Sequence, residues 1–144
     1  MTELTPKQIA LGIRAVKAGW KWALGDVVRE WATHKGVAIA DCLVDVVVGI
    51  RKDGSLDTAF VEDAAWQPGS KLIPDPTARG FVSAALAQVR ERMDCVVFTS
   101  FDPDEGRWQV AFISSVGSTE FFEYHPTEAE AVVAALEATH ERAR

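Results

Sequence analysis

The chain has 144 residues, of which 48% are hydrophobic and 25% are charged. This length and balance are typical of one globular domain and exclude an intrinsically disordered chain. The 21 acidic and 15 basic residues give a formal net charge of −6, which argues against direct binding to nucleic acid. Such binding requires clustered lysine and arginine.

The compartment is predicted from the cysteines and the apolar runs. Cys42 and Cys95 lie far apart, without the spacing of a disulfide framework or a redox motif. The amino terminus lacks the pattern of a secretory signal, and no apolar run reaches the roughly 20 residues of a membrane span. We therefore expect a cytoplasmic protein that does not contact a membrane.

The first predicted element is a helix that begins at Pro6. Thr5 and Gln8 form a capping box around this start, and Gly19 can end the helix in a left-handed conformation. The apolar residues at helical spacing, which predict its buried stripe, are Ile9, Ile13, Val16 and Trp20.

A β-hairpin is predicted further along the chain. Residues 26–42 are compatible with either a short helix or a strand, because a short apolar run does not decide the period. Residues 43–51 predict a strand, and Asp53-Gly54 supplies a tight turn. The returning strand over residues 56–62 is expected to place Leu56 and Phe60 on one side. The alternating residues that predict the apolar face of the first strand are Val44, Val46, Val48 and Ile50.

The prolines at 68, 74 and 76 predict a loop before a second helix. Asp75 is the expected N-cap of this helix, with Pro76 in its first turn. Its predicted apolar stripe consists of Val82, Ala85, Leu86, Val89 and Met93. The residues Arg90, Glu91 and Arg92 are expected to finish the helix in solvent.

Three strands and a third helix follow. Residues 95–101 and 107–114 are predicted strands on either side of a hairpin loop, and residues 119–124 form a short aromatic strand. Thr127 and Glu130 form a capping box for the last helix. The predicted fold is a single α+β domain over residues 1–144, in the order α-β-β-α-β-β-β-α. It contains an antiparallel, meandering sheet of about five strands with three helices packed on it.

Four segments resemble small, uncharacterised phage and prophage proteins. These proteins share a tryptophan pair near the N-terminus, an Asp-Pro-x-x-x-Gly helix start and a closing Thr-Glu-Ala-Glu-Ala helix. The matching segments are Gly19-Trp20-Lys21-Trp22, residues 74–80, Val89-Arg90-Glu91 and residues 126–138. The resemblance implies a phage or prophage origin, and hence the host cytoplasm, and it carries over no catalytic residue.

The sequence contains no catalytic or metal-binding signature, so we expect no catalytic residue, no metal and no cofactor. Cysteine–histidine pairs can be drawn between Cys95 and His125 or between Cys42 and His34, but Cys95 opens an apolar run that is typical of a buried, inert thiol. Glu30 and His34 are four residues apart, and Glu137, His140 and Glu141 cluster on the last predicted helix. Solvated helix charges explain both groups better than a zinc site does.

Tryptophans and acidic residues are the candidate partner-binding groups. Trp22, Trp31 and Trp66 lie next to charges or in loops, where indole rings often anchor interfaces. Asp102, Asp104 and Glu105 crowd one hairpin loop. They could hold calcium weakly, but they lack the ligand spacing of a calcium loop.

Three functions remain open at this point. The first is a non-catalytic protein-binding module of phage type, whose acids dock on a basic protein surface. It would be an inhibitor of a host defence system such as a CRISPR effector. The second is a small enzyme or ligand-binding protein with a pocket between helices and sheet that uses His34, Asp41 or His125. The third is a homodimer that closes through an exposed sheet edge or tryptophan face.

Overall fold

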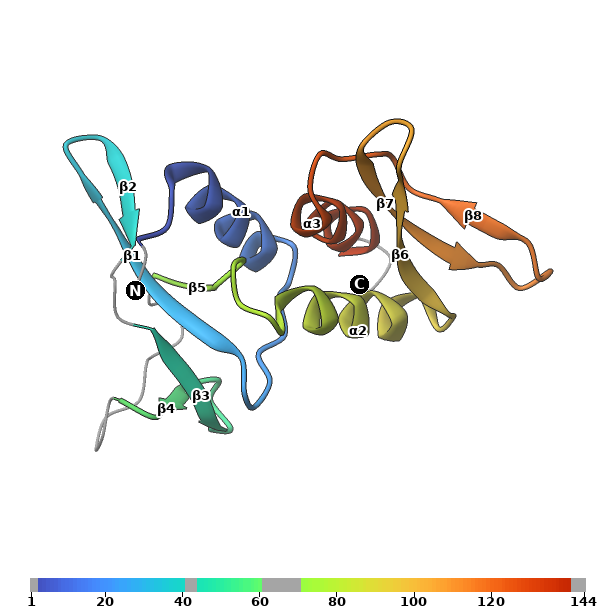
Figure 1. Ribbon diagram of the computed structural model, residues 1–144. Coiled ribbons are helices and arrows are strands. Elements are labelled where there is room, and N and C mark those ends of the chain that lie inside the picture. Colours follow the sequence, from blue (N-terminus) through green and yellow to red (C-terminus); the bar gives the residue numbers. More distant parts are fainter. Residues whose placement is uncertain (1–2, 41–43, 61–70, 141–144) are drawn as a thin grey trace. The chain divides into compact units, whose positions relative to one another are not determined.

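The structure is a computed structural model in which residues 3–40, 44–60 and 71–140 are described (Figure 1). Contacts within the chain group it into two compact units. The first unit comprises Met1–Val16 and Lys21–Phe81, and the second comprises Lys17–Trp20 and Val82–Arg144. Each unit has its own antiparallel sheet. The single domain expected over residues 1–144 stays a prediction.

The first unit is built around one central strand. Its elements are α1 (Pro6–Lys17), β1 (Val27–His34), β2 (Val37–Ala40), β3 (Asp45–Ile50), β4 (Leu56–Thr58) and β5 (Leu72–Pro74). Strand β1 pairs antiparallel with β2, β3 and β5, and β4 pairs with β3. The sheet order is therefore β2-β1-β3-β4, with β5 also bonded to β1.

Two small apolar clusters hold this unit together. One contains the buried residues Leu4, Ile9, Ala40 and Ile73, with Ile13, Trp31 and Ala38 packed against it. Helix α1 approaches β5 closely there: a Cβ atom on Gly12 would lie 2.8 Å from Ile73 Cδ1. The other cluster contains Val28, Val47, Leu56 and Leu72, with Trp22 packed against it.

A buried ion pair links β1 to the end of β5. The Arg29 Nε–H donates to Asp75 Oδ2 at 2.9 Å, and both side chains are only 4% exposed. The other oxygen of Asp75 accepts from the backbone N–H of Thr77 at 2.8 Å and from its hydroxyl at 2.6 Å. The Asp75 carboxylate is therefore neutralised and hydrogen-bonded inside the protein, as a buried charge must be.

The second unit is a three-stranded meander with α3 packed on it. Its elements are most of α2 (Phe81–Met93), then β6 (Val97–Asp102), β7 (Arg107–Ile113), β8 (Thr119–Phe121) and α3 (Glu128–His140). The sheet order is β6-β7-β8, and both pairs are antiparallel. Helix α3 lies against β6 and β7 (Figure 1) and buries Val132, Val133 and Leu136.

Arg92, in the last turn of α2, bonds to two other segments of the second unit. Its guanidinium donates to the Leu136 carbonyl at 2.8 Å, the Ala18 carbonyl at 2.8 Å and the Gly19 carbonyl at 3.1 Å. Burial lowers the pKa of this guanidinium. Ala18 and Gly19 follow the end of α1, where backbone carbonyls lack partners within the helix, so Arg92 satisfies groups there that would otherwise need water.

The α+β class and the three helices are confirmed. The N-caps of the two predicted capping boxes form: Gln8 N–H donates to Thr5 Oγ1 at 3.2 Å, and Glu130 N–H donates to Thr127 Oγ1 at 3.1 Å. The Asp53-Gly54 turn also forms, with Gly54 at φ 89°. The strands belong to two sheets, because β1 recruits its own neighbours and none of the described strands joins β6–β8 to them.

Two segments differ from the predicted order. Residues 26–42 contain β1 and β2, joined by Lys35 and Gly36, whose φ values are 51° and 78°. Lysine is not a turn signal of the Asn-Gly type, so the sequence left this hairpin undecided. Asp75 does not cap α2, which starts at Phe81. It follows β5 instead and pairs with Arg29.

Some predicted faces are also wrong. Val48 and Ile50 are 57% and 45% exposed, whereas Val47, just before them, is 1% exposed. Alternation separates two faces of a strand but does not say which one is covered. Phe60 (76% exposed) and Val16 (40%) are also outside the core, and Arg92 is partly buried rather than solvated.

Candidate functional site

The sheet of the second unit has one face on α3 and one face away from it. Thr99 belongs to the first face, because its hydroxyl donates to Glu128 Oε2 of α3 at 2.6 Å. Phe98 therefore points to the opposite side. Phe98 on β6 is opposite Ala111 on β7, and Ala111 is opposite Phe121 on β8. Directly opposed side chains share a face, so these three residues form one row. The Ile113 N–H donates to the Val96 carbonyl at 3.0 Å, which places that pair in the next row.

We call this surface the open face; it consists of Val96, Phe98, Ala111, Ile113 and Phe121. Three of these side chains are exposed, Val96 by 58%, Phe98 by 38% and Phe121 by 54%, whereas Ala111, between Phe98 and Phe121, is 0% exposed. Single exposed apolar residues are ordinary, but adjacent rows of them on one sheet are typical of a contact surface. The open face is the candidate site.

An acidic loop, residues 102–106, joins β6 to β7 at one end of this sheet. The Asp102 Oδ1 atom accepts from the backbone N–H of Asp104 at 2.9 Å and of Glu105 at 3.3 Å. Tyr124 donates its hydroxyl to Asp102 Oδ2 at 3.3 Å, and desolvation together with the Asp102 charge raises the pKa of Tyr124. Asp102 thus shapes the loop, while Asp104 and Glu105 are exposed to solvent.

The charge around the open face is one-sided. Residues 95–127, which contain all three strands, include five acidic residues and only one basic residue, Arg107. The acidic residues are Asp102, Asp104, Glu105, Glu120 and Glu123. Glu120 lies opposite Phe112 and so belongs to the other face, which leaves the 102–106 loop as the acidic group at the end of the open face; this charge favours a partner of opposite charge.

The predicted tryptophan anchors lie in the first unit and pack against its clusters. Trp22 is half-buried against the Val28 cluster. Trp31 is half-buried against the Ile9 cluster, and the Lys71 Nζ atom lies 4.8 Å from the centroid of its ring. Trp66 lies outside the described residues. Partner binding through these tryptophans stays a prediction.

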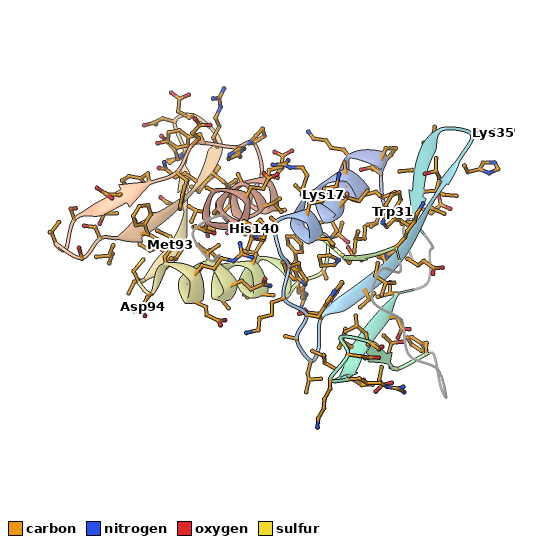
Figure 2. The ribbon with its side chains drawn as sticks, turned by 180° about the vertical axis from the view of Figure 1, so that it is seen from behind. Lys17, Trp31, Lys35, Met93, Asp94 and His140 are labelled. Atoms are coloured by element: carbon orange, nitrogen blue, oxygen red, sulfur yellow. The ribbon has the colours of Figure 1, made fainter. Side chains whose placement is uncertain are left out.

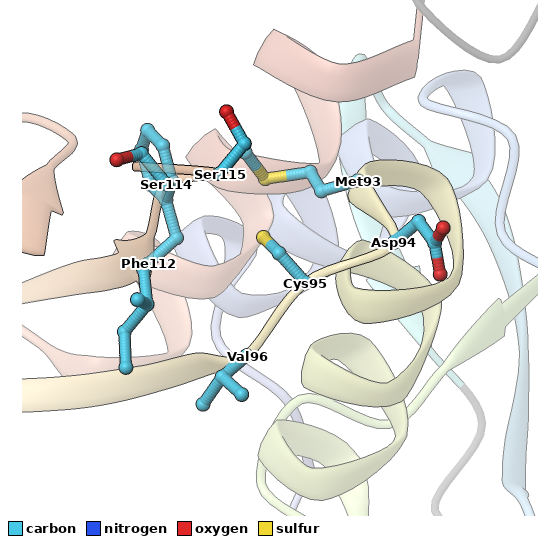
Figure 3. A pocket seen from close by; sticks show the side chains of 8 residues that line it. Met93, Asp94, Cys95, Val96, Phe112, Ser114 and Ser115 are labelled. Atoms are coloured by element: carbon cyan, nitrogen blue, oxygen red, sulfur yellow. The ribbon is translucent and has the colours of Figure 1, made fainter. Parts of the chain in front are cut away.

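The apolar run around Cys95 led us to expect a buried thiol, but Cys95 is partly exposed and lines a pocket (Figure 3). The pocket has a volume of about 480 Å³ and lies where the end of α2 meets β6 and β7. Its lining residues are Met93, Asp94, Cys95, Val96, Phe112, Ile113, Ser114 and Ser115. In Figure 3 the Asp94 carboxylate is directed away from the Cys95 thiol, so it does not supply a base beside that thiol.

The catalytic pairs considered from the sequence are not assembled. Cys95 lies beside the Val96–Ile113 row, whereas His125 is bridged to Trp108. Trp108 and Ile113 are separated by roughly 16 Å of extended strand at 3.3 Å per residue. His34 is exposed at the end of β1 in the first unit, and Asp41 and Cys42 lie outside the described residues.

The metal-binding groups considered from the sequence are not assembled either. Glu30 and His34 lie on a strand, not a helix, which places them roughly 13 Å apart. The ring of His140 lies against Gly19, and Glu141 is not among the described residues. Within the described ranges, no three His, Cys, Asp or Glu side chains come together as metal ligands would.

Comparisons with protein families, with curated proteins and with solved structures found no match for this chain. In the part of the chain that the structure describes, no helix is long and apolar enough to cross a membrane. The function must therefore be argued from the surface itself.

The apolar residues of the open face were not identified from the sequence. Val96 and Phe98 belong to a run that is typical of a buried strand, and Phe121 belongs to a short aromatic segment. Their common exposure follows from the register of β6 on β7 and of β7 on β8. The only available signal was the acidic loop, which marks one end of the same sheet.

Proposed function

We propose that this chain is a non-catalytic protein-binding module that docks through its open face on a basic protein surface. The observation that carries the proposal is the combination, on one three-stranded sheet, of exposed Val96, Phe98 and Phe121 with five acidic residues and one basic residue in residues 95–127. The apolar rows would supply contact area, and the acids would steer and orient the partner.

The partner class follows from this charge. Basic, partly apolar surfaces are common where a protein binds nucleic acid, and an acidic module can occupy such a surface in place of the phosphate backbone. An inhibitor of a nucleic-acid-binding defence protein of the host, such as a CRISPR effector, is the form of the proposal that agrees with a phage or prophage origin.

The test is affinity capture with a matched control. The immobilised chain, its Phe98→Ser/Phe121→Ser variant and a Phe60→Ser variant would each be exposed to a bacterial lysate, and the retained proteins quantified by mass spectrometry. Phe60 is an exposed phenylalanine of the first unit (76%), so its replacement removes similar apolar area elsewhere. We expect one basic protein to be retained by the wild type and by the Phe60 variant and lost with the open-face variant.

The purified partner then allows a quantitative test. Each truncated aromatic at the centre of the contact should raise Kd by at least about tenfold. Asp104→Asn/Glu105→Gln should slow association at low salt, and the difference from wild type should shrink as salt is added. Affinity that is independent of salt would contradict the electrostatic role. Equal losses with the Phe60 and open-face variants would contradict the assignment of the surface.

A second candidate function is supported by the pocket beside Cys95. Its volume of about 480 Å³ lies within the range of small-ligand sites, and it places two serines and a thiol near apolar side chains. A small molecule that remains bound in native mass spectrometry, and that is lost when Cys95→Trp fills the pocket, would favour ligand binding. A wild-type chain without such a molecule would favour the protein-binding module.

A further inference from the structure

Strand β2 forms one end of the sheet of the first unit. Its partner on one side is β1, with Trp31 opposite Ala40 and His34 opposite Val37. No strand within residues 3–40, 44–60 and 71–140 pairs with its other side. Figure 2 shows Lys35, at the turn of this hairpin, well away from the labelled Trp31 at its base.

The hydrogen bonds of β1 show which backbone groups of β2 face the unpaired side. The Trp31 N–H donates to the Lys71 carbonyl at 2.9 Å, so the backbone of Trp31 is directed toward the β5 side. Backbone direction alternates along a strand, so Ala32 and His34 bond to Ile39 and Val37 opposite them. Ala38 and Ala40 therefore direct their N–H and C=O groups to the side where β2 has no described partner.

Strand β2 also lacks the features with which proteins block sheet edges. Charged residues, prolines and bulges usually prevent an edge strand from pairing with another chain. The β2 sequence, Val-Ala-Ile-Ala, carries no charge and no proline, and Val37 and Ile39 on its exposed face are 50% and 49% exposed. The other described edge strands each carry a charge or a proline: Asp57 in β4, Pro74 in β5, Asp102 in β6 and Glu120 in β8.

We infer that β2 is a self-association edge, at which a second copy of this chain adds its own β2 antiparallel across a two-fold axis. An axis at Ala38 places Val37 of each copy opposite Ile39 of the other, so both exposed apolar pairs are covered at once. It also places Gly36, without a side chain, opposite Ala40, which is only 8% exposed. An uncharged strand repeated on itself brings no like charges together, which favours a second copy over a charged foreign strand.

The first test is the oligomeric state of the full chain, measured by sedimentation over a range of concentrations. Wild type should dimerise, and Ile39→Lys should raise the dimer Kd by at least about tenfold, because an ammonium would be desolvated opposite Val37 of the other copy. Val48→Lys is the matched control, since Val48 is similarly exposed (57%) but lies on β3. Its dimer Kd should stay within about twofold of wild type.

A compensating pair tests the register. Val37→Lys and Ile39→Glu should each weaken the dimer. The variant with both changes should restore it, because the ammonium introduced at position 37 of each copy then meets the carboxylate introduced at position 39 of the other. Circular dichroism confirms that each variant is folded. A double variant no stronger than the single ones would overturn the Ala38 register.

A cysteine cross-link provides a readout that needs no weakened variant. With Cys42 and Cys95 changed to serine, chains carrying Val37→Cys should form a disulfide with chains carrying Ile39→Cys, since the Cα spacing of opposed strand residues suits a disulfide. Failure to cross-link would overturn the inference. So would a wild type that stays monomeric, including one that binds a foreign strand at β2, or a dimer unaffected by Ile39→Lys.

Discussion

The two units of the chain hold an arginine in opposite ways. In the first unit, Arg29 is buried against a carboxylate, Asp75, and the charge is cancelled inside the protein. In the second unit, Arg92 bonds to the backbone carbonyls of Leu136, Ala18 and Gly19. A carbonyl group carries no net charge, so the positive charge of Arg92 is not cancelled as that of Arg29 is. The first arrangement links β1 to the residue that follows β5, and the second links α2 to α3 and to the segment that follows α1.

The two units also differ in net charge. The first unit has ten acidic and nine basic residues, whereas the second has eleven acidic and six basic residues. The second unit therefore carries most of the chain's negative charge and the open face, which favours a basic partner. The first unit is nearly neutral and has an uncharged edge at β2, which favours a copy of itself.

The largest effect that we expect tests the buried pair of the first unit. Asp75→Ala removes a carboxylate from beside buried Arg29 and should lower the free energy of unfolding by about 3–5 kcal/mol. Denaturation with urea measures this loss. The matched control is Asp57→Ala, because the Arg51–Asp57 pair has a similar 2.9 Å contact but is 53% and 39% exposed. Its loss should be about 0–1 kcal/mol.

A double variant shows whether the unpaired buried charge causes the loss expected for Asp75→Ala. Replacing both partners, as in Arg29→Met/Asp75→Leu, should recover most of the stability that Asp75→Ala loses, because no charge is then left in the core. Equal losses for Asp75→Ala and Asp57→Ala would show that burial does not set the strength of these pairs.

A smaller effect is expected for the arginine of the second unit. Arg92→Met keeps the apolar stem but removes the donors to three carbonyls, and should cost roughly 2 kcal/mol. Arg90→Met is the control, since the Arg90 Nε–H donates to a single carbonyl, that of Val97, at 2.9 Å. Hydrogen exchange should show lost protection in α3 for Arg92→Met. Equal costs for the two variants would contradict the role given to Arg92.

The features predicted correctly from the sequence are local ones. The two partners of each capping box, Thr5 with Gln8 and Thr127 with Glu130, lie three residues apart, so a short window contains both. The Asp53-Gly54 turn is decided by glycine's access to positive φ. Helix number and fold class follow from such signals.

The features that were missed depend on partners distant in sequence. Arg92 was expected in solvent because its acceptor at Ala18 lies 74 residues earlier. Asp75 suited a helix cap locally, but its partner is in β1. The open face requires the register of three strands, and periodicity does not fix register when both faces of a strand carry apolar side chains.

The smallest expected effect separates backbone conformation from packing in the second unit. Gly19 and Gly117 have the same φ of 82°, but a Cβ atom would lie 2.7 Å from the His140 ring at Gly19, and nothing lies within 4 Å at Gly117. Gly117→Ala should therefore cost only the left-handed conformation, about 1 kcal/mol. Gly19→Ala should cost about 1 kcal/mol more, because the imidazole must move. Thermal unfolding of both variants measures the difference, and adding His140→Ala should remove it. If the difference remained without the imidazole, the close packing of Gly19 on α3 would not be its cause.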